Sequence, residues 1–256
     1  MQRLAAILFF ASMLGGCARR ESRAPAAQTL AEAKSALAER ERRLISFRLE
    51  GTVREEGQDA SFETAFRAPN RVRGVLRPAG RTLSFDGARL YELDPAKKTV
   101  LTLEPGEGSS GALTQLMAAF VPEGYRAPLM PLASARARRL RHPRGPQAVE
   151  LSSETRDEQG RAVQVAYVLR WPSADLIEKR LSAYGTTKTL VVDEEHCDRR
   201  LNACFPRKLT ERVDGRVGAV TTLTRIELNA AIPADEFIVS TPEGYLAQTQ
   251  GPPPPR

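Results

Sequence analysis

The stretch Ser46-Phe-Arg-Leu-Glu-Gly-Thr-Val53 alternates apolar and polar side chains. A period of two is typical of a β-strand with one buried face. The two faces of this predicted strand carry different residues: Phe47, Leu49 and Val53 on one, Arg48, Glu50 and Thr52 on the other. The stretch therefore predicts a sheet that is apolar on one side.

The same alternation continues toward the C-terminus, with turns between the runs. Glu56-Gly57-Gln58, Asp86-Gly87 and Asp94-Pro95 are turn sequences. Between them we predict strands at Ser61–Phe66, Arg71–Leu76, Arg81–Phe85, Ala88–Leu93 and Thr99–Leu103. This order predicts a meander of antiparallel strands.

A second series of strands follows later in the chain. Val163–Trp171 places Val163, Val165, Tyr167, Leu169 and Trp171 on one face, and further strands are predicted near 176–184, 188–193, 206–213 and 217–229. Residues 104–111 predict a loop and Ala112–Phe120 a short helix, whereas 121–147 give no assignment. The fold class is therefore mainly β (α+β), with nine to eleven strands and two or three helices.

One amphipathic helix precedes the first strand. Thr29-Leu-Ala-Glu32 has the form of a capping box, and the helix is expected to run to about Leu44. Its apolar residues fall near one face and its charged residues elsewhere: Leu30, Ala33, Leu37 and Leu44 against Lys34, Glu39, Arg40 and Arg43.

The N-terminus has the pattern of an export signal. Arg3 precedes an eleven-residue apolar run, Leu4–Leu14, which is too short for a stable membrane span. The run ends in Leu14-Gly15-Gly16-Cys17, which resembles the bacterial lipobox, whose cysteine is acylated. An ordinary secretory signal with a chance cysteine is the alternative.

These observations divide the chain into four parts. Residues 1–16 are the expected signal peptide, 17–28 the acylated cysteine and a tether, 29–247 a single curved-sheet domain, and 248–256 a proline-rich tail. By resemblance to the enterobacterial sorting rule, in which Asp after the cysteine means inner-membrane retention, Ala18 points to the outer membrane.

Composition excludes several classes of protein. The chain has 256 residues, 41% hydrophobic and 27% charged, which excludes wholesale disorder. After the N-terminus it has no apolar run of 18 residues, which excludes a polytopic membrane protein. Its net charge of +7 would ordinarily suggest nucleic acid, but export makes nucleic acid a poor partner, whereas lipid phosphates stay available.

Three cysteines are too few for a disulfide scaffold. Cys197 and Cys204 lie in a polar hairpin, and in an oxidising periplasm such a pair favours a disulfide. The alternative is a metal site, helped by His196 and the acidic residues before it, but the C-x6-C spacing does not fit the common zinc motifs. We therefore expect a disulfide and no metal.

Motifs of catalysis are absent from the sequence. It contains no G-x-S-x-G, phosphate loop or dinucleotide fingerprint. Its two histidines are His142 and His196, and the first lies in an arginine-rich segment that offers it no orienting carboxylate. The sequence therefore predicts a protein that is not an enzyme and uses no cofactor.

That arginine-rich segment has two interpretations. Five arginines occur in nine residues, and they could contact anionic lipid headgroups or an acidic partner: Arg136, Arg138, Arg139, Arg141 and Arg144. The alternative is a solvated loop in a chain that prefers arginine, since it has 32 arginines against 6 lysines.

Several motifs, taken in order, resemble the bacterial lipoprotein carrier (LolA/LolB-like) superfamily. The first are Ala65-Phe-Arg-Ala-Pro-Asn-Arg-Val-Arg73 and the hairpin Asp86-Gly-Ala-Arg-Leu-Tyr-Glu-Leu-Asp-Pro95 with Lys98-Thr-Val100. Ile226-Glu-Leu-Asn229, Ile232–Phe237 and Pro242-Glu-Gly-Tyr245 resemble the closing segment of the family. The resemblance spans about residues 29–247, except that 104–215 matches no family pattern.

The resemblance implies an incomplete antiparallel β-barrel, whose concave apolar face is covered by helices and holds acyl chains. The expected cavity residues are Phe47, Leu49, Phe62, Phe66, Leu83, Phe85, Tyr91, Val165, Tyr167, Leu169 and Trp171. The alternative for each of them is a place in a fully packed core.

The functional expectation follows from the anchor and the cavity together. We expect a periplasm-facing outer-membrane lipoprotein, anchored at Cys17, that binds acyl chains of lipoproteins or lipids for their sorting. Its expected partners are the membrane, lipid or lipoprotein acyl chains and a further protein. Two alternatives stay open: an envelope-stress sensor or regulatory binding module of the same fold, and a purely structural envelope lipoprotein.

Overall fold

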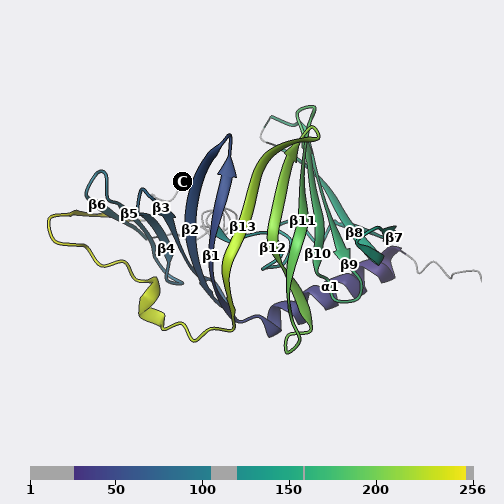
Figure 1. Cartoon of the computed structure of the whole chain (residues 1–256), viewed down its shortest axis with the longest axis horizontal. Coiled ribbons are helices and arrows are strands. Elements are labelled where there is room, and N and C mark those ends of the chain that lie inside the picture. Colours follow the sequence, from purple (N-terminus) through teal and green to yellow (C-terminus); the bar gives the residue numbers. More distant parts are fainter. Residues whose placement is uncertain (1–25, 105–119, 158, 252–256) are drawn as a thin grey trace, which may run out of the picture.

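All strands in the part of the chain that the structure describes belong to one sheet. The computed structural model describes residues 26–104, 120–157 and 159–251, and in this part of the chain it contains a 14-stranded sheet. The strand order is β14-β6-β5-β4-β3-β2-β1-β13-β12-β11-β10-β9-β8-β7. Figure 1 shows the strands from β6 to β7. Neighbouring strands are antiparallel except β14 and β6, which are parallel.

The elements follow one another along the chain in two series. The first series is α1 (Ala26–Arg43), β1 (Ser46–Glu55), β2 (Gln58–Arg67), β3 (Arg71–Arg77), β4 (Arg81–Phe85), β5 (Leu90–Asp94) and β6 (Thr99–Leu103). The second is β7 (Arg136–His142), β8 (Gly145–Arg156), β9 (Ala162–Arg170), β10 (Leu176–Ala183), β11 (Thr186–Asp198), β12 (Ala203–Val213), β13 (Arg216–Leu228), the 3-10 helix η1 (Ala234–Phe237) and β14 (Leu246–Gln250).

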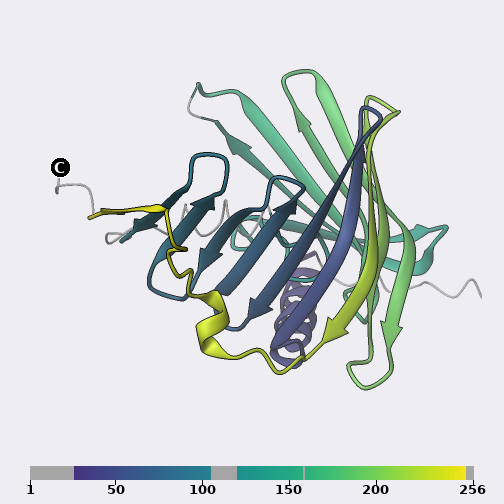
Figure 2. The ribbon, with the colours of Figure 1, turned by 60° about the vertical axis from the view of Figure 1, so that its left-hand side comes forward.

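The sheet is strongly bent and does not close into a barrel. The first wing runs from β6 to β1 and includes β1–β4, and the second runs from β13 to β7. The wings meet at the pair β1–β13, and Figure 2 shows them on the two sides of the concave inner face of the sheet, which we call the trough. The pairing of β1 with β13 shifts register between Glu50 and Gly51. A β-carbon at Gly51 would lie 2.7 Å from the carbonyl oxygen of Thr222, so only glycine allows this close approach. The predicted fold class, an incomplete curved antiparallel sheet with an N-terminal helix, is confirmed.

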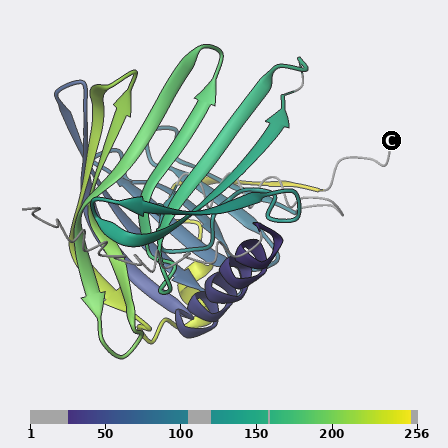
Figure 3. The ribbon, with the colours of Figure 1, turned by 90° about the vertical axis from the view of Figure 1, so that its right-hand side faces the viewer.

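Helix α1 packs on the inner face of the sheet. Ala33 and Leu37 are buried against Val149, Leu151 and Tyr167 of the β7–β9 end. Figure 3 shows the helix lying along this side of the trough. The inner face is therefore partly covered by a helix that ends only three residues before β1 begins.

The start of α1 differs from the prediction. The helix begins at Ala26, so residues 26–28 of the predicted tether are helical. Thr29 is buried inside the helix and is not its cap. Glu32 instead accepts hydrogen bonds from Gln28 and from Arg139 on β7.

The outer face of the β1–β4 wing is covered by the chain after β13. Phe237 and Ile232 pack with Ala65 there. Arg48 on β1 forms an ion pair with Glu236 of η1, and Ser84 on β4 donates a hydrogen bond to the carbonyl oxygen of Phe237 at 2.7 Å. One wing therefore has apolar contacts on both faces.

Three strands were not predicted. β7 and most of β8 fall in the unassigned range 121–147 and just after it, and β14 includes residues 248–250 of the predicted tail. All five residues of β14 are exposed, so its pairing with β6 gives no hydrophobic pattern to detect. The Arg-rich segment is a strand and not the loop of the alternative interpretation.

Some predictions fall outside the described residues. These are the predictions for residues 1–25, which include the signal peptide and Cys17, and for residues 252–256 of the predicted tail. Residues 112–119 of the predicted short helix also lie outside the described part. Within the described part, no helix combines the length and the apolar character needed to cross a membrane.

Candidate functional site

The inner face of the β1–β4 wing is a continuous apolar surface. Phe47, Phe66, Val72 and Phe85 lie directly opposite one another across the four strands. The rings of Phe47 and Phe66 are stacked with their centroids 5.0 Å apart. Because cross-strand neighbours share a face, the register itself assembles this surface. Leu49, Phe62 and Leu83 extend it.

Residues 120–127, which we call the plug segment, lie on this surface. Phe120 sits over Gly74 so closely that a β-carbon there would be 1.8 Å from Cδ1 of its ring. Thr64, the cross-strand neighbour of Gly74, donates a hydrogen bond to the carbonyl oxygen of Phe120 at 2.7 Å. The absence of a side chain at Gly74 therefore leaves the space in which the ring of Phe120, at one end of the plug segment, packs.

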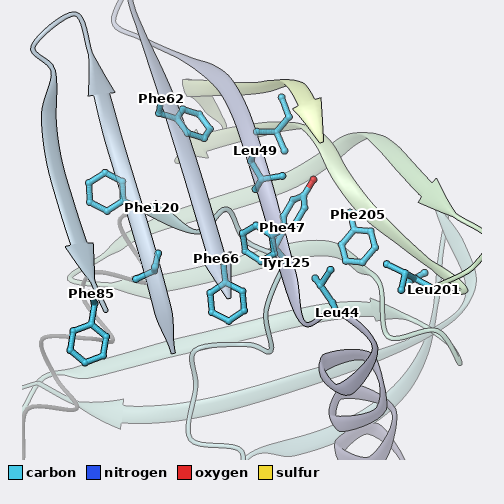
Figure 4. Packing of buried hydrophobic residues seen from close by; sticks show 13 residues of the cluster. Leu44, Phe47, Leu49, Phe62, Phe66, Phe85, Phe120, Tyr125, Leu201 and Phe205 are labelled. Atoms are coloured by element: carbon cyan, nitrogen blue, oxygen red, sulfur yellow. The ribbon is translucent and has the colours of Figure 1, made fainter. Parts of the chain in front are cut away.

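Tyr125 lies between Phe47 of β1 and Phe205 of β12, as Figure 4 shows. Its ring centroid lies 5.3 Å from those of Phe47 and Phe205. Its hydroxyl donates a hydrogen bond to the carbonyl oxygen of Pro206 at 2.9 Å, and burial raises the pKa of this hydroxyl. Tyr125 thus joins β1 to β12 across the trough.

A buried arginine of α1 holds the other side of the plug segment. Nη2 of Arg40 donates to the carbonyl oxygens of Gly124 at 2.7 Å and Cys204 at 3.1 Å. Its guanidinium lies 4.3 Å from the centroid of the Phe205 ring, a cation–π distance. Burial lowers the pKa of Arg40, and the carboxylate of Asp175 acts in the opposite direction.

Asp175 connects this arginine to the β11–β12 hairpin. It accepts hydrogen bonds from the backbone N–H of Cys204 at 3.0 Å and from the hydroxyl of Ser173 at 2.6 Å. Arg170 lies 3.3 Å from Asp175 and donates to both carboxylate oxygens of Glu195. The buried pair Arg40–Asp175 and the half-buried pair Arg170–Glu195 therefore form a chain of alternating charges.

Cys197 and Cys204 form a disulfide beside this network. They lie directly opposite each other on β11 and β12. Their sulfur atoms and the carboxylate of Glu195 lie within 4.8 Å of one another, but bonded cysteines offer no thiolate to a metal.

A second anchor joins the plug segment to α1. Glu41 accepts a hydrogen bond from the backbone N–H of Ala127 and lies 3.0 Å from the guanidinium of Arg126. That guanidinium lies 4.4 Å from the ring centroid of Phe66, and burial lowers the pKa of Arg126. Arg40 and Glu41 therefore tie one helix turn to two points of the plug segment.

The inner face of the second wing is covered mainly by α1. Tyr167 and Leu169 are buried, and Val165 and Trp171 are half-buried around them. Trp171 lies just beyond the end of β9, with Arg139 over its ring at 5.0 Å.

Of the predicted cavity residues, all but Tyr91 pack in the two inner-face clusters. Tyr91 lies opposite Ser84, which points to η1, so it belongs to the outer face. Its hydroxyl donates a hydrogen bond to Asp86 at 2.8 Å. The register of the β4–β5 hairpin places Leu90, and not Tyr91, opposite Phe85, so Leu90 lies on the inner face and Tyr91 does not.

The sequence interpretation missed Arg40, Gly74, Phe120 and Tyr125. It placed Arg40 away from the apolar face of the helix, which was wrong. Leu37 and Leu44 lie three and four residues from Arg40, so helical spacing puts it on the buried face. For Gly74, a glycine inside a strand was the available signal, since it often marks the close approach of another segment.

The five clustered arginines are placed along β7 and its turn to β8. Three of them donate hydrogen bonds to other residues of the protein. Arg138 donates to Glu150, Arg139 to Glu32, and Arg144 to the carbonyl oxygen of Val192. Arg141 also lies on β7, and Arg136 begins that strand. The cluster is therefore not a row of free cations.

No family model and no curated protein matches this sequence. Solved structures do resemble the fold. A domain described as an outer membrane lipoprotein-sorting protein from Vibrio parahaemolyticus has a TM-score of 0.54 at 13% identity, covering 83% of this chain and 97% of its own. A LolA superfamily protein from Nitrosomonas europaea has a TM-score of 0.51 at 13% identity, covering 81% and 97%.

A third similar structure is a DUF1329 family protein from Desulfovibrio piger, with a TM-score of 0.52 at 9% identity, covering 82% of this chain and 97% of that one. These identities are low, so the likeness defines the fold alone. The chain has a LolA-like fold, and its sequence departs widely from these proteins of the same fold.

Proposed function

We propose that the protein is a periplasm-facing outer-membrane lipoprotein, anchored through an acylated Cys17, that binds acyl chains of lipoproteins or lipids on the inner face of its sheet. The observation that carries the proposal is the plug segment. It covers an apolar surface with only a few side chains of its own, and Phe120 and Tyr125 stand where hydrocarbon would bind.

Binding would exchange one apolar occupant for another. Removing apolar surface from water contributes about 25 cal/mol per Å², and the inner face gains this with either the plug segment or a hydrocarbon chain. An acyl chain therefore competes with Phe120 and Tyr125 for Phe47, Phe66 and Phe205. The equilibrium depends on the polar contacts that hold the plug segment.

Few polar contacts have to break when the plug segment leaves. Among the described residues they include the hydrogen bonds Thr64–Phe120, Arg40–Gly124, Tyr125–Pro206 and Glu41–Ala127, with the ion pairs Lys179–Glu123 and Arg126–Glu41. Three of these contacts, Arg40–Gly124, Glu41–Ala127 and Arg126–Glu41, reach α1, so movement of the helix and of the plug segment is coupled. Helix displacement would then open the face for a chain.

Anchoring supports the sorting role. The lipobox-like sequence before Cys17 and the following Ala18 support attachment to the outer membrane. A tethered binding protein acts as a receptor for hydrophobic cargo more readily than as a soluble shuttle. This role is binding and not catalysis.

Native mass spectrometry of residues 17–256 carrying Cys17→Ser tests the proposal. We expect co-purifying lipid, or uptake of labelled palmitate with a stoichiometry of one or more per chain. Phe47→Glu, which puts a charge on the inner face, should abolish uptake. A matched surface variant, Ile45→Glu, should retain uptake because Ile45 is 55% exposed. A clean apo mass with no palmitate uptake would contradict acyl-chain binding and favour the structural lipoprotein.

The anchor is tested separately. Metabolic labelling with palmitate should depend on Cys17 and be lost in Cys17→Ser. Membrane fractionation then distinguishes the two membranes, and recovery with the inner membrane would contradict the assignment to the outer one.

A further inference from the structure

A polar pocket of about 420 Å³ lies on the outer face at the β7–β10 end of the sheet. One row of the sheet crosses it. Arg136 lies opposite Ser152, Ser152 opposite Ala166, and Ala166 opposite Arg180. The two middle side chains are small, so a hollow forms between two arginines.

Most of the charge around this pocket is already paired. Glu150 accepts from Nε of Arg138 at 2.7 Å and from Nη2 of Arg180 at 2.6 Å. Each of its oxygens therefore has a guanidinium partner. Burial alone would raise the pKa of Glu150, but these hydrogen bonds and charges outweigh it and lower the pKa, so the group is ionised at neutral pH.

Two opposite charges at the pocket are left over. Arg136 is exposed and has no hydrogen bond or ion pair with the residues that the structure describes. Glu154 is also exposed, and its carboxylate accepts a 3.3 Å hydrogen bond from the neutral amide of Gln164. Neither charge is neutralised by a charge of the opposite sign within that part of the chain.

The spacing of these two charges fits a zwitterion. Glu154 is two residues beyond Ser152 on β8, which places it about 7 Å along the strand from the partner of Arg136. Diagonal neighbours at this spacing are within reach of long side chains, yet here they stand apart with a pocket between them. A ligand with a phosphate and an ammonium group separated by a short linker would satisfy both.

An apolar pocket of about 550 Å³ adjoins the polar one. The two share Arg136, Glu150 and Ser152 in their linings. The apolar one is formed where the first turns of α1 meet β7, by Ala26, Ala27, Leu30, Ala135 and Ala137. A charged compartment next to an apolar one matches an amphiphile, with its headgroup in the first and the start of its hydrocarbon in the second.

The pair of pockets lies at the end of α1 that is nearest the anchor in sequence. Eight residues lie between Cys17 and Ala26, and the nine Cα–Cα steps that join the two span at most about 32 Å when fully extended. If Cys17 is acylated, as the proposed function states, this end of the protein stays close to a membrane surface. The inference rests on the proposed function for the membrane that supplies the ligand. The match between the charges of the pocket and those of the ligand does not depend on it.

We propose that Arg136 and Glu154 bind the headgroup of a zwitterionic phospholipid, with the phosphate at Arg136 and the ammonium group at Glu154. This site is separate from the inner face: it selects by headgroup, whereas the inner face selects by hydrocarbon. It would orient the protein on the membrane or receive a lipid before its chains move inward.

The test uses residues 17–256 with Cys17→Ser and isothermal titration of dihexanoyl-phosphatidylethanolamine below its critical micelle concentration. Arg136→Gln should weaken binding about tenfold, the effect of one charge-assisted hydrogen bond, and Glu154→Gln should weaken it by several-fold. Arg216→Gln is the matched control, because Arg216 is another exposed arginine that lies at the distant β12–β13 turn. That variant should bind as the parent does.

Two further lipids separate the contribution of the ammonium group to binding from that of the phosphate. Dihexanoyl-phosphatidylglycerol lacks the ammonium group, so its affinity should fall with Arg136→Gln and not with Glu154→Gln. Dihexanoylglycerol, which lacks the headgroup phosphate, should bind at least tenfold more weakly than the phosphatidylethanolamine. The proposal would be overturned if dihexanoylglycerol bound as tightly as dihexanoyl-phosphatidylethanolamine. It would also be overturned if Arg136→Gln had no effect on the affinity for the phosphatidylethanolamine. Tight binding of inorganic phosphate alone would also overturn it, because the site would then be a phosphate site.

Failure here and failure of the proposed function give different results. Palmitate uptake by the inner face should be unchanged in Arg136→Gln. Palmitate uptake without headgroup-dependent binding would remove only this inference. Headgroup-dependent binding without palmitate uptake would remove only acyl-chain binding by the inner face.

Discussion

Arg40 on α1 and Asp175 between β9 and β10 bring opposite charges within 3.7 Å at a site where their side chains are only 7% and 3% exposed. The pair also joins three separate segments, since Arg40 binds Gly124 and Cys204 while Asp175 binds the backbone of Cys204. Buried ion pairs gain little over apolar contacts, but breaking one leaves an uncompensated charge in a medium of low dielectric constant.

Removing one partner should therefore destabilise the protein strongly. We expect Asp175→Asn to lower the free energy of unfolding by about 3 kcal/mol. Urea denaturation followed by circular dichroism at pH 7 measures this change. The exposed pair Arg54–Asp59 offers the matched control, because its side chains are solvated and Asp59→Asn should leave the midpoint unchanged. A loss in Asp175→Asn no larger than in Asp59→Asn would show that Arg40 is not buried in solution.

Substitution of Gly74 should displace the plug segment from the inner face. Gly74→Ala introduces a methyl group where Phe120 already lies, so the ring must leave its seat. We expect the variant to bind a fluorescent fatty acid more tightly, by several-fold, because the plug segment competes less well for the inner face. A titration with cis-parinaric acid measures the affinity.

Two controls separate this effect from general damage. Gly218→Ala is the matched substitution, because its new methyl group would meet its nearest atom, in Val213, at 3.4 Å, and it should leave affinity unchanged. Phe120→Ala should raise affinity by itself, and Gly74→Ala should add little to it. Additive effects of the two substitutions would mean that Gly74 acts elsewhere.

The sequence predicted the sheet better than it predicted what lies on the sheet. A period of two is local, so the strands from Ser46 to Leu103 and from Ala162 to Leu228 could be found from neighbouring residues alone. The plug segment has no such period, since Phe120, Gly124 and Tyr125 gain their positions from contacts with β1, β3 and β12. Those contacts depend on register and on bends such as that at Gly51, which local sequence does not specify.

Arg40 and Tyr91 illustrate two different errors. Helical spacing was enough to place Arg40 on the apolar face, but its charge argued against burial until Asp175 and the two carbonyl oxygens were known. Tyr91 was among the expected cavity residues, whereas the alternation of side chains along the hairpin places it on the outer face. Spacing along the element decides the face in both cases.

Glu150 should contribute to acid sensitivity. Its pKa is lowered in the folded protein by Arg138 and Arg180, which outweigh the opposing effect of burial. A carboxyl group with a depressed folded pKa stabilises the protein above its unfolded pKa, about 4.3, and that contribution is lost as pH falls through the folded value. We therefore expect Glu150→Gln to reduce stability at pH 7 and to change it little at pH 2. Urea midpoints at the two pH values give the comparison, and an equal loss at both would contradict the assignment.

The disulfide should stabilise both the hairpin and the contacts of Arg40. Closing a loop of eight residues contributes about 2.5 kcal/mol in the chain-entropy description, so Cys197→Ser with Cys204→Ser should lower the free energy of unfolding by roughly that amount. The backbone of Cys204 also binds Arg40 and Asp175, so loosening the hairpin should weaken the hold on the plug segment. Hydrogen exchange at Gly124 and Tyr125 should therefore increase in the double variant more than at Leu223, which lies on β13 away from the bridge. If exchange rises equally at all three residues, the bridge acts only through global stability and is not coupled to the plug segment.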